Sequence, residues 1–390
     1  MKHLIIENVG PIKYANLYFN KYNVIIGPQS SGKSCVIKIA SFCTWVEKRI
    51  QLLQSVEEFN NDNFIDNLVN FHKLFGYLKP ESKITYETHY LRFSYFHETK
   101  ELKFYWGKIH YEYKRPKVSY IPAERNLVSV IPNWMDLTMK RNNIVSFLSD
   151  WDVARKSVKD LDILNLGVKY HYDFIHNTDE VFFAQDKRLE LTNTSSGLQS
   201  LIPLLIHLKY LTEDIYNDEK SEKIKDQHAL SVLPLILNEK LGSRMSSHYN
   251  KKFSTPRSTD SPLKVEIIGQ HPFVFPDIKV ADRIKRVYDN LINTKRSDVF
   301  IEEPEENLFP PTQKQLIEWI LDNSKNSTFT IATHSPYILT TFLSNRVKDF
   351  SLFYIPNFCE ESIVKTATQE ELQEIFDYGV DAFFNIDTLG

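Results

Sequence analysis

The stretch IIGPQSSGKSCVIK, residues 25–38, constrains the fold of this chain more than any other part of the sequence. It carries the spacing G-x-x-x-x-G-K-S at Gly27, Gly32, Lys33 and Ser34. An apolar run precedes the motif, and apolar residues at helical spacing follow it to about residue 54. A strand, a glycine-rich loop and a helix in this order are typical of an α/β fold.

The same segment carries the groups that bind a nucleotide's phosphates. Glycines let backbone amides close around phosphate oxygens, and the positive end of the helix dipole adds to the attraction. Lys33 would reach the β- and γ-phosphates, and the Ser34 hydroxyl would be a ligand of Mg²⁺. The residues expected to bind ATP are Gly27, Pro28, Gln29, Ser30, Ser31, Gly32, Lys33, Ser34 and Cys35.

Two glutamates follow a short apolar strand in DVFIEEPEENLFP, residues 298–310. Open α/β sheets place ligands at the carboxyl ends of strands, so we assign Glu302 to Mg²⁺ and Glu303 to polarising the attacking water. Neighbouring strand residues face opposite sides, so both roles require the strand to end here, and Pro304 marks that end. An acidic, solvated turn is the alternative interpretation.

A second apolar strand, in TIATHSP, places His334 at its tip. A histidine there can hydrogen-bond a γ-phosphate or hold the attacking water next to the base. The alternative is a structural histidine next to Ser335, which would cap the following helix. The position of His334 after the acidic strand favours the catalytic role.

The rest of the chain alternates strands and helices around an aromatic, β-branched stretch from Lys83 to Ile121, which predicts a strand meander that includes KIHYEY and KVSYIPA. Residues 142–162 predict a helix. We expect a mixed, mostly parallel sheet flanked by helices, an N-terminal antiparallel β-subdomain and a helical insertion.

We expect one unit over residues 1–390. Its parts are N-terminal strands with the glycine-rich loop and first helix (1–54), a helical segment with the meander (55–141), a lateral helical region (142–216), a polar insertion (217–262) and a C-terminal part with both catalytic strands (263–390).

Charge and cysteine usage exclude several classes of protein. The chain has 47 Lys and Arg against 50 Asp and Glu, so no overall charge favours nucleic acid or an anionic membrane. Cys35, Cys43 and Cys359 have no metal-type spacing and cannot all pair, which suits a reducing cytoplasm. There is no signal-peptide pattern and no apolar stretch of membrane-spanning length, so we expect a cytoplasmic protein without a membrane partner.

Together the motifs resemble those of the ABC-type ATPase superfamily, in particular the branch shared by SMC-like, RecF-like and OLD-like proteins. LIIENVGPIKYANLYFNKYNVIIGPQSSGKS is similar to the start of that branch, with its Walker A motif. IEEPEENLFP resembles the block DEPE-x-x-LHP, and ATHSP the switch-histidine block. The resemblance implies a P-loop NTPase head of ABC type that hydrolyses ATP with Mg²⁺.

SSGLQS, residues 195–200, resembles the ABC signature, with Ser196, Gly197 and Gln199 at the matching positions. It begins a helix, so its backbone amides are free to bind a phosphate. In this superfamily the signature of one subunit closes on the Walker site of another, which implies a head-to-tail homodimer with ATP between the protomers. Without the resemblance, TSSG would be an ordinary helix cap.

The sequence departs from the family pattern at three places. Glu302 replaces the usual Walker B aspartate, and Phe309 stands where a histidine is common. No glutamine is evident at the Q-loop, where the nearest candidates are Glu124 and Arg125 in YIPAERN. Either this pair faces the phosphate or the junction between lobes, or it forms a salt-bridged turn.

Prolines and polar stretches between residues 198 and 298 exclude the coiled coil of SMC-like proteins. The chain after His334 is too short for the Toprim domain of OLD-like nucleases, so we expect no nuclease activity in this polypeptide. The style of these motifs resembles ATPase subunits of bacterial anti-phage defence systems such as Septu, PARIS and some retrons. The leading hypothesis is therefore an ATPase that dimerises on ATP and controls a separate effector, in which the 217–262 insertion and the meander would offer partner surfaces.

Two alternatives stay open. A DNA-repair or chromosome-maintenance ATPase would bind duplex DNA, and the segment Arg244–Arg257, with His248, Lys251 and Lys252, carries local positive charge suited to phosphates. A scaffold that binds ATP without hydrolysing it is the second alternative. The insertion itself is either a partner surface or a tolerated disordered loop.

Overall fold

The computed structural model describes residues 2–60, 62–131, 134, 138–184, 187–216, 227–242, 264–268, 271–275, 278–356 and 362–379. Its largest element is an 11-stranded mixed sheet. In spatial order the strands are β6 (Glu101–Trp106), β5 (Leu91–Phe96), β4 (Leu78–Glu87), β1 (Lys2–Val9), β2 (Ile12–Phe19), β17 (Ser362–Thr366), β16 (Phe350–Tyr354), β3 (Tyr22–Ile26), β15 (Ser327–Ala332), β14 (Arg296–Glu302) and β7 (Pro116–Ile121).

The sheet combines a parallel half and an antiparallel half. Strands β16, β3, β15, β14 and β7 pair in parallel with one another. Strand β17, which joins the two halves, is antiparallel to β16 and parallel to β2. Strands β2, β1, β4, β5 and β6 pair antiparallel. The predicted fold class, an α/β fold with a mixed sheet flanked by helices and an antiparallel N-terminal part, is confirmed.

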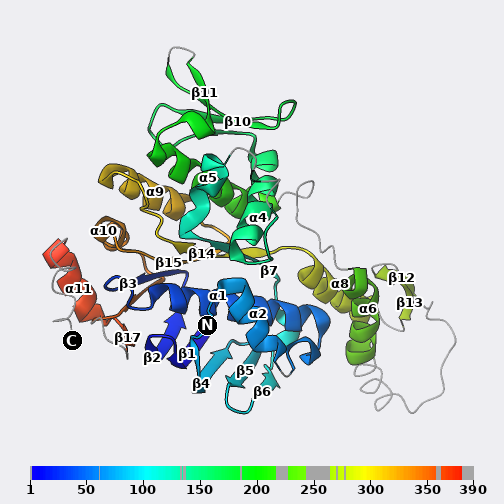
Figure 1. Ribbon diagram of the computed structural model, residues 1–390. Coiled ribbons are helices and arrows are strands. Elements are labelled where there is room, and N and C mark those ends of the chain that lie inside the picture. The colour runs from blue at the N-terminus through cyan, green and yellow to red at the C-terminus, as the bar shows by residue number, and fades with distance from the viewer. Residues whose placement is uncertain are drawn as a thin grey trace, which may run out of the picture.

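Helices cover both faces of the sheet (Figure 1). The helices of the described residues are α1 (Lys33–Leu53), α2 (Asn63–His72), α3 (Leu127–Val130), α4 (Asn143–Val158), α5 (Ser196–Thr212), α6 (Gln227–Leu237), α8 (Ile278–Ile292), α9 (Pro310–Asn323), α10 (Pro336–Ser344) and α11 (Gln369–Tyr378). Of these, α6 and α8 lie to one side of the sheet and share a core with Leu52 near the end of α1. A smaller sheet of β8 (Asp160–Asp162), β9 (Lys169–Asp173), β10 (Thr178–Phe182) and β11 (Arg188–Glu190) lies beyond α4 and α5, and a hairpin of β12 (Lys264–Ile268) and β13 (His271–Phe275) lies near α6 and α8 (Figure 1). No helix of the described residues has both the length and the apolar character needed to cross a membrane.

The alternation of side chains along the parallel strands separates two hydrophobic cores. On β14, Val299 and Ile301 belong to the core that also contains residues of α4, α5, α9 and α10. Phe300, between them, belongs to the core shared with α1, α2 and the antiparallel strands. Glu302 is the next residue in this alternation, so its side chain faces α1, as that of Phe300 does.

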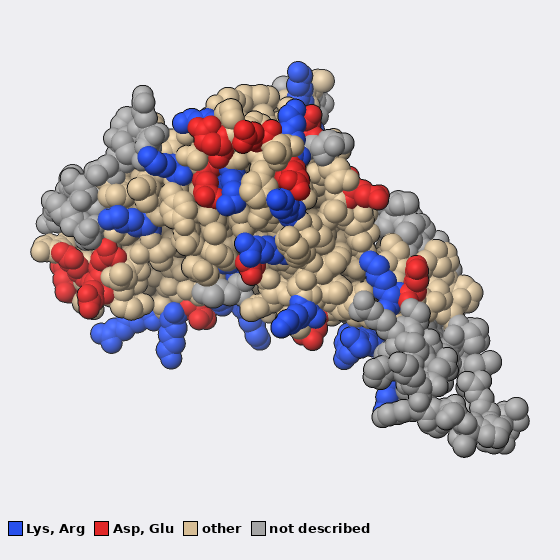
Figure 2. Space-filling view, turned by 90° about the horizontal axis from the view of Figure 1, so that it is seen from below, with Lys and Arg blue, Asp and Glu red and all other residues tan. Residues whose placement is uncertain are grey.

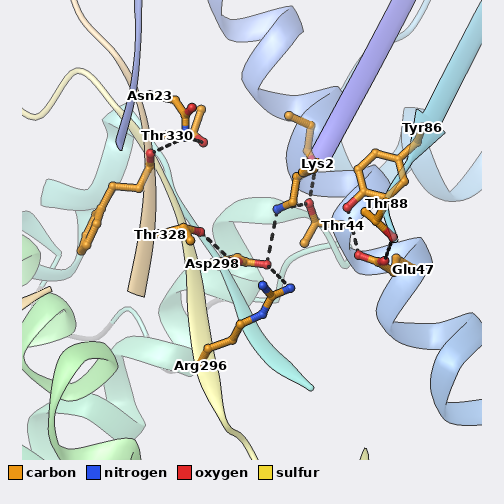
Figure 3. Close-up of polar contacts among 12 residues, drawn as sticks. Lys2, Asn23, Thr44, Glu47, Tyr86, Thr88, Arg296, Asp298, Thr328 and Thr330 are labelled. Atoms are coloured by element: carbon orange, nitrogen blue, oxygen red, sulfur yellow. Dashed lines mark hydrogen bonds and ion pairs between the residues drawn. The ribbon is translucent and has the colours of Figure 1, made fainter. Parts of the chain in front are cut away.

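A buried polar network fixes the amino end of β14, opposite the nucleotide-binding motifs (Figure 3). Asp298 accepts hydrogen bonds from Lys2 (3.4 Å) and Thr328 (2.6 Å) and forms an ion pair with Arg296 at 3.5 Å. Although burial alone would raise it, the charges of Arg296 and Lys2 bring the pKa of Asp298 to about 2. The network ties β1, β14 and β15 together at the end of β14 away from Glu302.

Three details of the predicted secondary structure are wrong. KIHYEY does not form a strand, because His110–Glu112 form a 3-10 helix. KVSYI forms β7, but β7 pairs in parallel with β14 instead of extending the meander. A β-branched, aromatic pattern identifies a strand without identifying its partner. The predicted helix 142–162 ends at Val158, because Lys159 adopts a positive φ of 58°.

Candidate nucleotide-binding and hydrolysis site

The glycine-rich loop runs from the end of β3 to the first turn of α1, and its path requires glycine. Gly32 has a φ of 107°, and a Cβ atom there would lie 2.5 Å from Cδ1 of Ile12 and 2.9 Å from Cγ of Pro11. A Cβ atom on Gly27 would lie 2.9 Å from Oγ of Ser31 and 3.0 Å from Cβ of Ile355. The spacing of the two glycines therefore reflects two places where the backbone has no room for a side chain.

Lys33 folds back over this loop. Its Nζ donates to the carbonyl oxygens of Gly27 (2.8 Å) and Pro28 (2.7 Å). Burial lowers the pKa of Lys33 to about 8, against the opposing charges of Glu303 and Glu305. A buried ammonium group that is held only by carbonyl oxygens gains from an anionic phosphate at the same position.

The first turn of α1 leaves backbone amides for a phosphate. The helix has no side-chain cap at Gly32 and no acidic residue in its first turn. The residues at its start differ in exposure: Ser34 is exposed, whereas Cys35 is buried. Burial raises the pKa of the Cys35 thiol to about 12, so Cys35 can contribute its backbone amide but no thiolate. Of the remaining loop residues, Gln29 and Ser30 are exposed and Ser31 is buried.

Glu302 is the last residue of β14 and faces α1, as the alternation requires. Its side chain is buried, and its Oε1 atom has no hydrogen-bond partner. Burial raises the pKa of Glu302, whereas Lys38 and the hydroxyl groups of Tyr120 and Ser34 lower it. An unpaired carboxylate oxygen beside the Ser34 hydroxyl provides hard oxygen ligands of the kind that Mg²⁺ prefers.

These donors fit a nucleotide-bound metal ion. No group of three or more His, Cys, Asp and Glu side chains that could hold a metal occurs among the described residues. Mg²⁺ at phosphate sites is bound by one or two protein oxygens and by the phosphates, so the pair Ser34 and Glu302 is sufficient for it.

Glu303 leaves the strand in a left-handed conformation, with a φ of 44°. Its backbone amide donates to the carbonyl of Ala332 (2.8 Å), while its side chain is half-exposed. Oε1 of Glu303 lies 3.8 Å from Nε2 of His334. The change in backbone direction lets two adjacent glutamates serve one site, which an uninterrupted strand would not allow.

His334 follows β15 at the same edge of the sheet. Burial lowers its pKa, the charge of Lys33 lowers it further, and Glu303 opposes both. The ring is therefore neutral near pH 7 and offers one donor and one acceptor. The structure thus brings residues 27–35, Glu302, Glu303 and His334 together at the carboxyl ends of three adjacent parallel strands.

The sequence analysis missed Glu305. Its Oε1 accepts a hydrogen bond from the backbone amide of His334 at 2.6 Å, and burial raises the pKa of the carboxyl group. Its other oxygen, Oε2, is buried without a partner. Glu305 therefore fixes the position of His334. The second glutamate pair in EEPEE was the only signal for it.

Arg125 lies between the end of β14 and α5, and it also forms an ion pair with Glu306 at 3.8 Å. It therefore shows features of two interpretations that the sequence left open, a junction between parts of the fold and a salt-bridged turn. Its guanidinium group is fully buried and donates to the carbonyl oxygens of Glu302 (3.1 Å), Glu303 (2.9 Å) and Pro304 (3.3 Å). It also donates to the carbonyl of Ser200 in α5 (3.3 Å). Arg125 therefore holds the backbone at the end of β14, where Glu302 and Glu303 lie.

Glu124, its neighbour, is exposed. The charge of Glu124 contributes to the raised pKa of Glu302, so the two carboxylates lie close to one another. No hydrogen bond of Glu124 to the loop 27–35 occurs, and both segments are fully described.

The signature segment starts α5, with Ser195 at the cap and no side-chain cap hydrogen bond. Ser196 is exposed, and a Cβ atom on Gly197 would lie 3.1 Å from the carbonyl oxygen of Asn307. Gln199 instead serves the local turn, because its Nε2 donates to the carbonyl of Thr192 at 2.9 Å. Residues 195–199 and 27–35 are all described, and no hydrogen bond or ion pair joins them within the chain.

Above about pH 8, we expect ATP binding to take up a proton and to weaken as the pH rises. In the protein without ATP, Lys33 has a pKa of about 8, so it is mostly neutral at higher pH. Phosphates next to Lys33 favour its charged form, so ATP binding at high pH must be accompanied by the uptake of a proton. Below that pH the lysine is already charged, and no uptake is expected. Calorimetric titration with ATP at about pH 9, in buffers of different ionisation enthalpy, measures the uptake.

The matched variant is Lys33→Arg, which stays charged over this range. Its ATP affinity should not change between about pH 7 and 9. Equal proton uptake by the variant and the wild type would contradict the assignment of the titration to Lys33.

No protein-family model matches the chain, and no curated protein matches its sequence. Among solved structures, the SMC head domain from Thermotoga maritima is similar with a TM-score of 0.43 and 10% identity, over 94% of this chain and 98% of that one. An SmcHead bound to the C-winged helix domain of ScpA is similar with a TM-score of 0.43 and 9% identity, over 96% of this chain and 99% of that one. The third is an Smc head domain derived from Pyrococcus furiosus, with an extended coiled coil and bound to the C-terminal domain of ScpA. Its TM-score is 0.41 and its identity 8%, over 97% of this chain and 99% of that one. At these identities and TM-scores, none of these likenesses bears on what this chain does.

Proposed function

We propose that this chain is an ABC-type head that binds and hydrolyses ATP. The observation that carries the proposal is the unpaired, buried oxygen of Glu302 beside the Ser34 hydroxyl, at the start of a helix whose first turn has no side-chain cap. Lys33 lies at the same place, where its ammonium group bonds to the carbonyl oxygens of Gly27 and Pro28 and could exchange them for phosphate oxygens. A cation ligand, an ammonium group and free amides at one edge of a parallel sheet match the charge of a nucleoside triphosphate.

In the proposed reaction, the amides at the start of α1 and Lys33 bind the β- and γ-phosphates and orient them. Ser34 and Glu302 would hold Mg²⁺, which neutralises charge on the phosphate oxygens when it is bound. Glu303 orients the attacking water and accepts its proton, since it is half-exposed at the open side of the site. Neutral His334, fixed through Glu305, donates to the γ-phosphate or to that water.

The signature supports a head-to-tail dimer. The amide groups that begin α5 have no side-chain cap, and Ser196 beside them is exposed. Because no contact joins this turn to the loop of the same chain, a second copy is the partner that would bring the two half-sites together. Arg125 donates to the backbone carbonyls of both Ser200, in α5, and Glu303. In the proposed dimer, each protomer would use its Glu303 in its own ATP site and its α5 signature in the partner's site, so Arg125 would connect the two sites.

Mixing two inactive variants tests this arrangement. Lys33→Ala removes the phosphate-binding ammonium, and Ser196→Glu places a negative charge at the exposed start of α5, where it repels phosphate. Each variant alone should lack ATP hydrolysis. A one-to-one mixture should regain about a quarter of the wild-type rate, because half of the dimers are mixed and each has one complete site.

Ser149→Glu, an exposed substitution on the neighbouring helix α4, is the matched control and should retain full activity. A mixture that stays as inactive as its components would show that each site works within one chain. Recovery above the components, by contrast, requires sharing of sites between chains.

We further propose that the dimer controls a separate effector, of nuclease type, in a bacterial anti-phage defence system. Support for this finer statement comes only from the motif styles EEPEENLFP and SSGLQS. Affinity purification of the chain from its native operon, with and without ATP, tests it. Recovery of a neighbouring nuclease or reverse transcriptase in one nucleotide state is the expected result, and recovery of the chain alone would argue against it.

No described observation favours the alternative of a duplex-DNA-binding ATPase. The basic segment Arg244–Arg257 lies outside the described residues. On the face shown in Figure 2, basic and acidic side chains are interspersed. On the antiparallel strands, Lys83 pairs with Glu7 at 2.7 Å and Arg92 with Glu87 at 3.7 Å, which neutralises charge that DNA would otherwise need.

A further inference from the structure

A cavity of about 650 Å³ lies along the side of α1, away from its first turn. Its walls come from α1, α2 and β7, and from Arg141 and the first turn of α4. Ser41, which lines it, follows Lys33 by about 12 Å along the helix axis. The volume suits a small organic molecule, because ligand pockets in proteins commonly measure about 300–1,000 Å³.

Aromatic side chains form much of the wall. Phe42, Trp45, Phe71 and Tyr120 line the cavity, and the rings of Phe42 and Trp45 lie 5.7 Å apart. Aromatic faces of this kind bind planar rings by stacking, and they tolerate any heterocycle of suitable size.

Carboxamides on α2 line the exposed side of the same cavity. Asn63, Asn67 and Asn70 follow the spacing i, i+4, i+7, so they share one face of the helix, and all three are exposed. A carboxamide offers a donor and an acceptor side by side, which matches the edge of a nucleobase. Asn67 uses one amide hydrogen within the helix, in a bond to the carbonyl of Asn63 at 2.7 Å, and its carboxamide oxygen and second amide hydrogen lie beside that bond.

The charges around the cavity favour a neutral ligand. Arg49 is bound to Glu58 by hydrogen bonds of 2.9 and 3.1 Å, so its charge is already compensated. Asp66 adds a negative charge to the lining, and Arg141 a positive one. A cluster of cations that would attract a phosphate is not present among the described lining residues.

We propose that this cavity binds a neutral nucleoside, whose base stacks on the aromatic wall and hydrogen-bonds to the carboxamides of α2. The site is separate from the loop 27–35, so binding does not depend on the proposed ATPase function. Tyr120 lines the cavity and also adjoins Glu302, whose charge contributes to the raised pKa of the phenol. An occupied cavity therefore contacts a neighbour of the metal carboxylate.

Calorimetric titration of the full chain with adenosine, guanosine, cytidine and uridine, each alone, tests the proposal. We expect one of them to bind with one-to-one stoichiometry. Ser146→Trp, which fills the cavity from the exposed surface of α4, should weaken that binding at least about tenfold. Ser149→Trp, the same change at an exposed residue of α4 outside the cavity, should leave it unchanged.

Lys33→Ala should bind the nucleoside as the wild type does. Loss of binding in this variant would place the nucleoside in the ATP site and overturn the proposal. The absence of binding by all four nucleosides, or equal affinity of Ser146→Trp and the wild type, would overturn it as well. If Ser146→Trp does not fold, Asn70→Leu takes its place, with weakening of several-fold expected and unchanged affinity as the contrary result.

Discussion

Glu303→Gln is expected to lower kcat for ATP hydrolysis by about 10²- to 10³-fold, while the affinity for ATP changes less than about threefold. The substitution keeps the shape of the side chain and removes the carboxylate that would accept the proton of the attacking water. ATP binding depends on Lys33, Ser34 and the amides of α1, none of which the substitution touches. Steady-state phosphate release and equilibrium binding of ATP measure the two quantities separately.

Glu318→Gln is the matched control, because Glu318 is a half-exposed glutamate on α9, as Glu303 is half-exposed, and its ion pair with Lys314 is long, at 3.7 Å. It should retain the wild-type kcat. If the wild type hydrolyses ATP no faster than Glu303→Gln, the chain is a scaffold that binds ATP without hydrolysing it. A loss of ATP affinity in Glu303→Gln would instead place Glu303 in the binding site.

Arg125→Met is expected to lower the free energy of unfolding by about 3–5 kcal/mol. The guanidinium is fully buried and is the donor to four backbone carbonyl oxygens, at Ser200, Glu302, Glu303 and Pro304. Methionine fills similar space but removes four hydrogen bonds from a charged donor to buried carbonyl oxygens, and hydrogen bonds to charged groups contribute about 1.5–3 kcal/mol each. The carbonyl of Glu303 keeps its bond from the amide of Glu306 (3.1 Å), so the total loss is smaller than the sum of the four. Urea denaturation measures the loss.

The same variant should also lower kcat more than it raises KM. Arg125 holds the backbone at Glu303, which has a strained, positive φ, and its hydrogen bonds go to residues 200 and 302–304 rather than to the loop 27–35. Its loss therefore affects the position of the catalytic carboxylate rather than the binding of ATP. Activity is compared at a temperature where both proteins are folded, and Arg125→Lys, which retains the charge but offers fewer donors, should fall between them.

Arg92→Met provides the reference for loss of an exposed arginine. Arg92 is more than half exposed and lies 3.7 Å from Glu87, so its removal should cost less than about 1 kcal/mol. Equal losses of stability in the two methionine variants, with unchanged kcat in both, would contradict the assigned role of Arg125.

Much of the candidate site follows from local sequence. The spacing of Gly27, Gly32 and Lys33 predicted a loop between strand and helix, because only glycine fits the two crowded backbone positions. The apolar run before Glu302 and the one before His334 predicted strands, and parallel strands end at a common edge. These features need only contacts between near neighbours and the general rules of parallel sheets.

Partners from distant parts of the chain could not be read from the sequence. Strand β7 was recognisable from its residues, yet its pairing with β14 depends on which edge of the sheet was open. Glu305 became important only because the amide of His334, 29 residues further on, came within 2.6 Å. From the sequence, a salt-bridged turn was an equally good interpretation of Arg125, and its four carbonyl acceptors are evident only in the structure.

The sequence by itself determined the α/β class, the glycine-rich loop and the order of the two strands that end at Glu302 and His334, because each depends on periodicity and on residue types that tolerate one backbone shape. The tertiary structure alone decided how Glu302 and Glu303 share one site, through the positive φ of Glu303 and the buried donors of Arg125 that hold it. Conformations of this kind are unfavourable locally, and they persist only where surrounding contacts impose them.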